Sequence, residues 1–303
     1  MNEAIVFSLV FATLRSATPL IFAALGGLFS ERSGVINIAL EGLMLCGAFT
    51  AAVFTLQTQS PYLGFLAGLA AGAVVAAIYA IACIKFEADQ VVVGMAINFL
   101  MIGLPALISG VIYDSTGSTP QIPIEQKMPM MTTNLSSGTI LALVLVPICW
   151  YVIYKTPFGL RLRSIGENPS AADAAGVNVI RLRYVAVIIS GILAAAGGAY
   201  LSTGQSSLFT KQMTAGRGFI ALAALILAKW KPVPVLFACL FFGFTEASVV
   251  QIQGASWAKI NGEDIPVQFI EMIPYLLTII VLAGFIGLSR APKALGIPYR
   301  KEN

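Results

Sequence analysis

Long apolar blocks separated by short polar segments dominate this sequence of 303 residues. Several blocks reach the roughly 20 apolar residues that a helix needs to cross a hydrocarbon core about 30 Å thick. Only 11% of the residues are charged and 58% are hydrophobic, whereas a soluble domain has about 25% charged residues. The pattern predicts an all-α, polytopic membrane protein that forms one transmembrane domain over residues 1–303.

Apolar blocks between helix breakers define the expected crossings. The first block contains Arg15 and Pro19 and could consist of two pieces, so we expect eight to ten transmembrane helices. The blocks lie near Ala4–Phe29, Gly34–Leu56, Tyr62–Ile84, Gln90–Tyr113, Gly138–Tyr154, Tyr184–Ser202, Gly218–Ala228, Pro234–Val249 and Phe269–Leu288.

The block that begins at Gly218 is too short for a full crossing. Its 11 residues would span about 16 Å as a helix, roughly half the hydrocarbon core. We therefore expect a broken helix or half-helix there. Residues 34–39 and 218–223 also share the pattern Gly-apolar-Ile-x-apolar-Ala, which could reflect an inverted repeat of the kind that places a transport site near the membrane midplane.

The basic residues predict the orientation of the chain. If residues 155–183 are cytoplasmic and the spans alternate, 13 of the 18 Lys and Arg residues face the cytoplasm and 4 face outward, with Arg15 inside the membrane. This asymmetry follows the positive-inside rule, so the net charge of +4 reflects topology and not nucleic-acid binding. The longest outward loop, residues 114–137, is rich in Thr, Ser and Pro and could meet an external partner. The cytoplasmic set is Arg32, Lys85, Lys155, Arg161, Arg163, Arg181, Arg183, Lys229, Lys231, Arg290, Lys293, Arg300 and Lys301.

Cysteine and histidine usage argues against metal or redox chemistry. Cys46, Cys83, Cys149 and Cys239 each lie alone in an apolar block, and the sequence has no His, so we interpret the cysteines as packing residues. The small residues of 67–72 and 194–198 are likewise interpreted as close-packing surfaces. The sequence also lacks the GxxxxGK[ST] motif that binds nucleotide phosphates, so this chain is not expected to be an enzyme or to hydrolyse ATP.

Residues 159–184 contain a short predicted helix outside the membrane. Asn168 can cap a helix that starts at Pro169 and ends at Gly176. The helix is rich in alanine and has no large apolar side chain for a core of its own. We expect it to dock on another protein, although an ordinary surface helix remains the alternative.

This segment resembles the cytoplasmic coupling loop of ABC importer permeases in the ribose, branched-chain amino acid and nucleoside group. The resemblance lies in Gly159-Leu160-Arg161, in Gly166-Glu167-Asn168-Pro169 and in Ala171-Ala172 through Gly176. Residues 24–34 leading to Glu41-Gly42, and Pro274-Tyr275 with the terminal residues 296–299, are similar to the smaller permease of nucleoside importers. Ala228 and Lys231 depart from the pattern around the Trp230–Pro232 turn.

The resemblance implies a set of partners and a location. These are ABC ATPase subunits that use ATP and Mg, a second and larger permease, an external lipoprotein that binds the solute, and the bilayer of the inner (plasma) membrane. This chain itself would bind no cofactor and no nucleic acid. The resemblance implies that the residues touching the ATPase are Glu167, Asn168, Pro169, Ala171, Ala172, Ala175 and Gly176.

Four polar residues at expected membrane depth are candidates for the solute pathway, because buried polar groups in a membrane are costly. Asn37 and Glu41 would share one face of the second span, and Asn98 and Glu246 lie in later spans. Amide and carboxylate groups suit the hydroxyl groups of ribose and the edges of nucleobases. Hydrogen bonds between helices, or ion pairs with Arg15 or Arg32, are the alternative roles.

We therefore expect a permease subunit that imports a nucleoside-like solute by alternating access. The same machinery could carry a simple sugar such as ribose, or a branched-chain amino acid. A transporter driven by protons or sodium ions is disfavoured by the absence of His and by the docking helix. A membrane enzyme is disfavoured because no nucleophile, base or metal cluster is visible in the sequence.

Overall fold

A computed structural model describes residues 3–131, 135–253 and 290–300, together with residues 259–260, 263–264, 272, 276 and 279–280. The described elements are almost all helical, as predicted. In chain order they are α1 (Glu3–Arg32), α2 (Leu40–Thr58), α3 (Pro61–Ala80), the π-helix η1 (Ile81–Lys85), α4 (Gln90–Tyr113), the 3₁₀ helix η2 (Ile124–Gln126), α5 (Ser137–Lys155), α6 (Pro157–Glu167), α7 (Pro169–Ala174), α8 (Val179–Tyr200), the π-helix η3 (Leu201–Ser206), α9 (Arg217–Leu227), α10 (Pro232–Gln253), β1 (Lys259–Ile260) and β2 (Glu263–Asp264).

Seven helices in the described part of the chain are long and apolar enough to cross a membrane. The first is one continuous helix through Pro19 and not two pieces. The 11-residue helix α9 is too short to cross, which confirms the short helix predicted at Gly218. The expected span near Phe269–Leu288 lies outside the described residues, so the total of eight to ten crossings stays a prediction.

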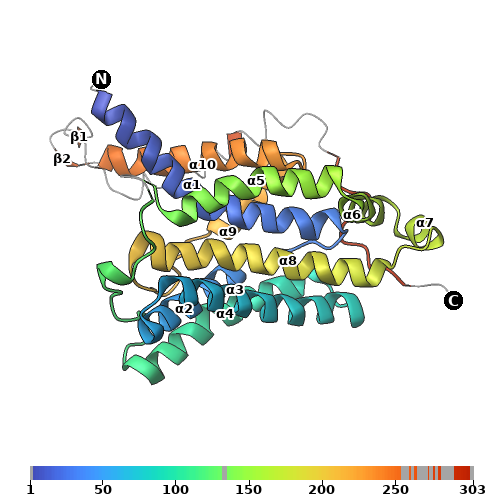
Figure 1. The fold of residues 1–303 in the computed structure, drawn as a ribbon, viewed down its shortest axis with the longest axis horizontal. Helices are drawn as coiled ribbons and strands as arrows, with labels where there is room; N and C mark the ends of the chain where they lie inside the picture. Colours follow the sequence, from blue (N-terminus) through green and yellow to red (C-terminus); the bar gives the residue numbers. More distant parts are fainter. Residues whose placement is uncertain are drawn as a thin grey trace.

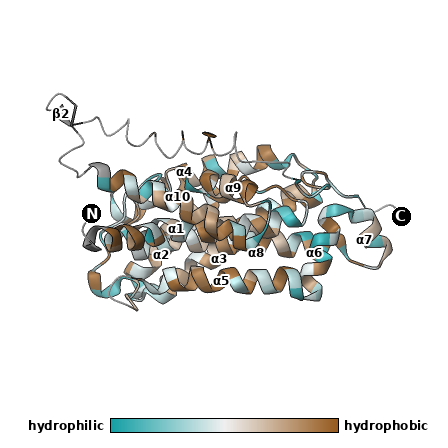
Figure 2. Cartoon of the chain, turned by 90° about the horizontal axis from the view of Figure 1, so that it is seen from above, coloured by the Kyte–Doolittle hydropathy of each residue, from teal (hydrophilic) through white to brown (hydrophobic). Residues whose placement is uncertain are grey.

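The long helices run side by side between two ends of an elongated molecule (Figure 1). One end carries α6, α7 and the C-terminal segment, and the N-terminus lies at the opposite end. Figure 2 shows apolar residues along the bundle and polar residues concentrated around α6 and α7. We call the end with α6 and α7 the basic end, because the described members of the predicted cytoplasmic set lie in the segments that meet there.

The opposite end is closed by two loops that pack on each other. The amide of Thr119 donates to the carbonyl of Phe209 at 3.0 Å, and the amide of Ile122 donates to the carbonyl of Ser207 at 2.7 Å. Residues 114–131 therefore cover the loop that leads into α9.

Helices α2 and α8 form the centre of the bundle and approach each other closely. A Cβ atom on Gly47 would lie 2.2 Å from the carbonyl oxygen of Ala195, and one on Gly198 would lie 1.8 Å from that of Met44. Helix α3 packs on the same pair, where a Cβ on Gly72 would meet the Cβ of Ala195 at 2.3 Å. The predicted close-packing role of these small residues is confirmed, because larger side chains would push the helices apart. The four cysteines are also buried.

Substitution of Gly198 tests this close packing. Gly198→Ala should lower the melting temperature in detergent by the equivalent of about 1–3 kcal/mol, because the new methyl group overlaps the Met44 backbone. Gly103→Ala is the matched control, since a Cβ on this α4 residue meets no described atom within 4 Å and alanine favours the helix. Equal melting temperatures for the two variants would contradict the packing.

Candidate functional site

The chain between α1 and α2 is not helical. Residues 33–39 turn back into the bundle at the basic end, starting at Gly34, whose φ of +92° lies in the left-handed region. The amide oxygen of Gln90 accepts from the Ile36 amide at 2.7 Å, and the Tyr79 hydroxyl donates to the Ile36 carbonyl. Side chains from α3 and α4 thus satisfy backbone groups that the bilayer could not.

The prediction that Asn37 and Glu41 share a helix face is wrong, because α2 begins only at Leu40. Asn37 instead lies in the non-helical segment and donates to the hydroxyl of Ser190 on α8 at 2.8 Å. Its amide oxygen is buried and has no hydrogen-bond partner among the described residues. Asn37 is therefore a candidate whose side chain retains a hydrogen-bond acceptor without a partner among the described residues.

Glu41 caps the short helix α9. Its carboxylate accepts from the Thr214 hydroxyl at 2.6 Å and from the amides of Gly216 at 2.8 Å and Gly218 at 2.6 Å. These amides belong to the first turn of α9, where no preceding helical carbonyl can accept from them. A carboxylate also suits the positive end of a helix dipole.

The N-terminal ends of α2 and α9 meet at this carboxylate. A Cβ atom on Gly218 would lie 2.5 Å from both the Cα and the amide nitrogen of Glu41, so only glycine allows this approach. The two six-residue segments with a shared pattern differ in conformation, since residues 34–39 are non-helical whereas 218–223 lie in α9. The similarity of these segments therefore does not extend to their backbone, and the inverted repeat stays a prediction.

The other two predicted pathway residues are paired within the chain. The side chain of Asn98 accepts from the Gly42 amide at 2.8 Å and donates to the Ile38 carbonyl at 2.9 Å. Glu246 on α10 forms an ion pair with Arg217 at the start of α9, and not with the predicted Arg15 or Arg32. Arg32 donates to the Trp230 carbonyl. Asn98 thus pairs with the backbone around the start of α2, and Glu246 pairs with the side chain of Arg217 at the start of α9.

Sequence reasoning missed Tyr79, Gln90, Ser190 and Thr214, which hold the same region. Gln90 begins α4 and Thr214 lies in the turn before α9, so both read as ordinary polar ends of spans. Ser190 is a polar residue inside a long apolar block. It could have been identified from the sequence, because polar residues at membrane depth are candidates for a functional role.

Two helices form the exposed surface at the basic end. The first is α6, an amphipathic helix that the sequence did not lead us to predict. Thr156 caps it by accepting from the Gly159 amide at 3.2 Å. The predicted cap of α7 is confirmed, since the Asn168 side chain accepts from the Ala171 amide at 3.0 Å. Gly176 ends this helix with a φ of +83°, also as predicted.

Only part of the surface of helix α7 is exposed. Ala172 is 5% exposed and packs into the core of this chain, so its side chain is not available to a partner, contrary to the interpretation of both Ala172 and Ala175 as docking residues. Pro169 is half-buried. The exposed predicted coupling residues are Glu167, Asn168, Ala171, Ala175 and Gly176.

The segment 290–300 ties this surface to the non-helical segment before α2. The Ala294 amide donates to the Gly166 carbonyl at 2.9 Å, and the Gly296 amide donates to the Gly34 carbonyl at 3.0 Å. The buried Arg183 guanidinium donates to the carbonyls of Ser33 and Ile297. These contacts place Gly296 and Ile297 of the predicted motif against the start of the non-helical segment.

The same segment is also anchored to the loop between α3 and α4. Arg300 hydrogen-bonds both carboxylate oxygens of Glu87, at 2.9 and 2.7 Å. These hydrogen bonds, with the charge of Arg300, hold the pKa of Glu87 below its usual value. The ion pair is therefore retained at neutral pH and weakens as the pH falls through that lowered pKa.

Comparisons with known proteins agree with this architecture. Residues 9–282 match the family described as the branched-chain amino acid transport system / permease component. The guanosine ABC transporter permease protein NupQ of Bacillus subtilis is 45% identical over 96% of this chain and 95% of its own length. The nucleoside ABC transporter permease protein NupC of Lactococcus lactis is 40% identical over 94% of each chain.

A solved structure of an ABC transporter in an inward-facing conformation has the same fold. Its TM-score is 0.51 at 15% sequence identity, with 92% of this chain and 86% of that chain covered. This likeness supports the helical architecture alone.

Removal of the Glu41 carboxylate should separate the two helix ends. Glu41→Ala leaves three donors, two of them buried, without this acceptor and should reduce stability by about 1–3 kcal/mol, whereas Glu41→Gln keeps one acceptor oxygen and should cost less. Melting temperatures in detergent measure the order of stability of wild type, Glu41→Gln and Glu41→Ala. The variant Glu125→Gln, at an exposed position, is the control. A Glu41→Ala protein as stable as wild type would contradict the capping role.

Proposed function

Because this chain belongs to the family of branched-chain amino acid transport system permease components, we propose that it imports a nucleoside-like solute as the permease subunit of an ABC importer. The main support for this cargo is the identity of 45% and 40% to permeases named for guanosine and nucleoside transport. The seven apolar helices make it a multi-pass membrane protein. We place it in the inner membrane with the basic end in the cytoplasm, as the positive-inside rule favours.

The partners follow from the division of labour in such an importer. A permease of this family works with other subunits, and we infer separate ATPases that bind ATP and Mg, a second and larger permease, and an external lipoprotein that delivers the solute. The exposed residues of α7 and the adjoining end of α6 would meet the ATPase. The loop 114–137 would face the external partner. This chain would bind no cofactor of its own.

For the solute pathway we propose a division of roles among the four polar residues. Asn37 would contact the solute, because its buried amide oxygen lacks a partner among the described residues. Asn98 would position the non-helical segment that carries Asn37, Glu41 would cap α9 against the start of α2, and Glu246 would fix the start of α9 through Arg217. A neutral amide suits a nucleoside better than the charged groups of an amino acid.

The coupling surface is tested with a charge on α7. Ala175→Asp should reduce ATP-driven uptake by about tenfold or more while the chain still inserts, because an unpaired carboxylate would be buried against the ATPase. Uptake and ATP hydrolysis are measured together in proteoliposomes. Ala291→Asp, an exposed position at the same end, is the control.

Normal ATP-driven uptake by Ala175→Asp would show that α7 does not contact the ATPase as proposed. Ala172→Asp should behave differently and lower the stability of the chain itself, since Ala172 is buried within it.

The cargo is tested by uptake of labelled guanosine, adenosine, ribose and leucine by the assembled importer. We expect uptake of the nucleosides, with Asn37→Ala mainly reducing the apparent affinity by a factor of about 5 to 150, and with only a small drop in melting temperature from the lost hydrogen bond to Ser190. Asn98→Ala should lower the melting temperature instead, because it frees two buried backbone groups. Uptake of ribose or leucine alone would refute the nucleoside cargo, and nucleoside uptake unaffected by Asn37→Ala would refute the site.

A further inference from the structure

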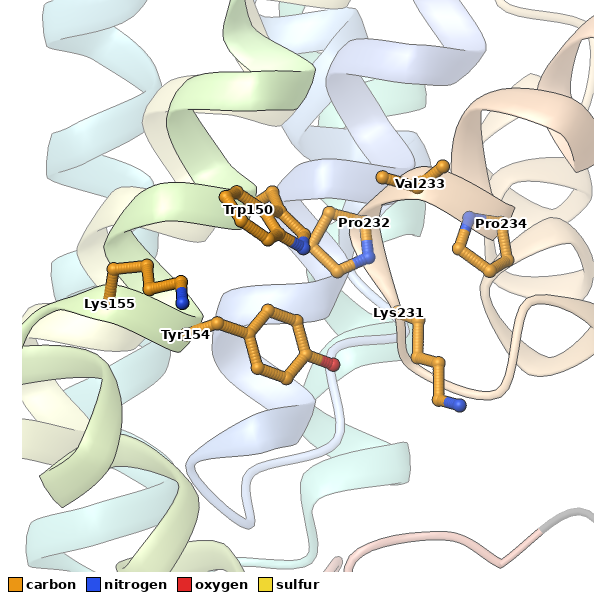
Figure 3. Close-up of a pocket in the computed structure, with 7 residues that line it drawn as sticks. All are labelled: Trp150, Tyr154, Lys155, Lys231, Pro232, Val233 and Pro234. Atoms are coloured by element: carbon orange, nitrogen blue, oxygen red, sulfur yellow. The ribbon is translucent and has the colours of Figure 1, made fainter.

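A pocket opens between the end of α5 and the start of α10, at the basic end of the bundle (Figure 3). Its volume is about 470 Å³, within the range of about 300–1,000 Å³ that is usual for small-molecule sites. Neither Asn37 nor the exposed residues of α7 line it. The lining residues are Trp150, Tyr154, Lys155, Lys231, Pro232, Val233 and Pro234.

The lining of the pocket carries two lysines and no described carboxylate. Lys155 and Lys231 flank the Tyr154 ring in Figure 3, and the Arg163 guanidinium lies 5.1 Å from the centre of that ring. None of the described lining residues is acidic, and neither lysine forms an ion pair in the part of the chain that the structure describes. The start of α10 adds the partial positive charge of a helix N-terminus.

The nearest buried carboxylate on this side is already engaged. Glu31 accepts from the indole nitrogen of Trp230 at 2.5 Å and is 5% exposed. It therefore points into the bundle and does not balance Lys231, which follows Trp230 in the chain.

The surroundings of the pocket suit a lipid more than a dissolved ion. Trp150 and Tyr154 are the residue types that gather where a bilayer meets water, and the Lys155 ammonium lies 5.8 Å from the Trp150 ring centre. Towards the bundle centre α5 and α10, which pack together, expose apolar side chains against which acyl chains can lie. This set comprises Val144, Ile148, Tyr151, Val233 and Phe237.

We propose that this pocket binds the phosphate-bearing headgroup of an anionic phospholipid from the cytoplasmic leaflet. The two lysines attract the phosphate, Trp150 and Tyr154 hold the glycerol region at the interface, and the acyl chains cover the exposed faces of α5 and α10. Basic pockets between transmembrane helices on the cytoplasmic side bind anionic headgroups in this way. The choice of leaflet rests on the proposed orientation, whereas headgroup binding in detergent depends on neither the orientation nor the cargo.

The test uses the assembled, delipidated importer in a neutral detergent. Its melting temperature is titrated with phosphatidylglycerol, with phosphatidylcholine carrying the same acyl chains, and with inorganic phosphate. We expect phosphatidylglycerol alone to stabilise the wild type. The double variant Lys155→Ala/Lys231→Ala should weaken the apparent affinity for phosphatidylglycerol about thirtyfold, since each lysine near the headgroups contributes about a factor of five.

Matched variants separate the pocket from general surface charge. Lys293→Ala, an exposed lysine at the same end, should bind phosphatidylglycerol as wild type does, and Lys155→Arg/Lys231→Arg should retain most of the affinity. Equal stabilisation by phosphatidylcholine or by inorganic phosphate would overturn the proposal. An unchanged double alanine variant, or an equal loss in Lys293→Ala, would do the same; if the double variant does not assemble, Lys231→Ala must show a fivefold loss.

Discussion

The capping of α9 by the Glu41 carboxylate is the interaction on which the interior of this bundle depends. A helix that starts inside a membrane exposes amide groups that neither lipid nor a preceding turn can satisfy. Here one side chain from α2 accepts from Thr214, Gly216 and Gly218 together. Because the same carboxylate belongs to the first turn of α2, it fixes the two helix starts against each other, and Gly218 allows the contact by having no side chain. The short helix α9 could not begin at this depth without such a partner.

The non-helical segment before α2 follows the same rule with different side chains. Gln90, Tyr79 and Asn98 pair with the backbone of Ile36 and Ile38, so each interruption of a helix is matched by polar groups on its neighbours. Asn37 is the exception, because its amide oxygen has no partner among the described residues. Irregular backbone at membrane depth is tolerated only where protein or a water-filled path lines it. An incompletely paired amide in this segment is therefore where a polar solute could gain a hydrogen bond.

Local signals in the sequence were enough to predict the long helices, the short helix at Gly218 and both caps of α7. Each of these depends on length, apolar content or a capping residue near the helix itself. The start of α2, the inward direction of Ala172 and the pairing of Glu246 with Arg217 depend on contacts between segments far apart in the chain, which no local pattern encodes. Asn37 and Glu41 illustrate the difference: their spacing of four suggested a shared helix face, but hydrogen bonds from α3 and α4 stabilise a non-helical backbone at Asn37. Polar type identified the right region, and tertiary pairing determined what each residue does there.

The segment 290–300 connects the proposed ATPase-contact surface to the segment that carries Asn37. It hydrogen-bonds the Gly166 carbonyl at the end of α6 and the Gly34 carbonyl in the segment that leads to Asn37, while Arg183 joins Ser33 to Ile297. Gly166 also lies directly against the backbone of Arg32, since a Cβ there would be 2.2 Å from the Arg32 carbonyl oxygen. Moving the α6–α7 surface independently of residues 33–39 would break these hydrogen bonds, each of which stabilises the fold by about 1 kcal/mol. The cheaper displacement moves the two together, so in the proposed coupling role a push on α7 would reach the segment that carries Asn37 through these backbone hydrogen bonds and the Arg183 side chain.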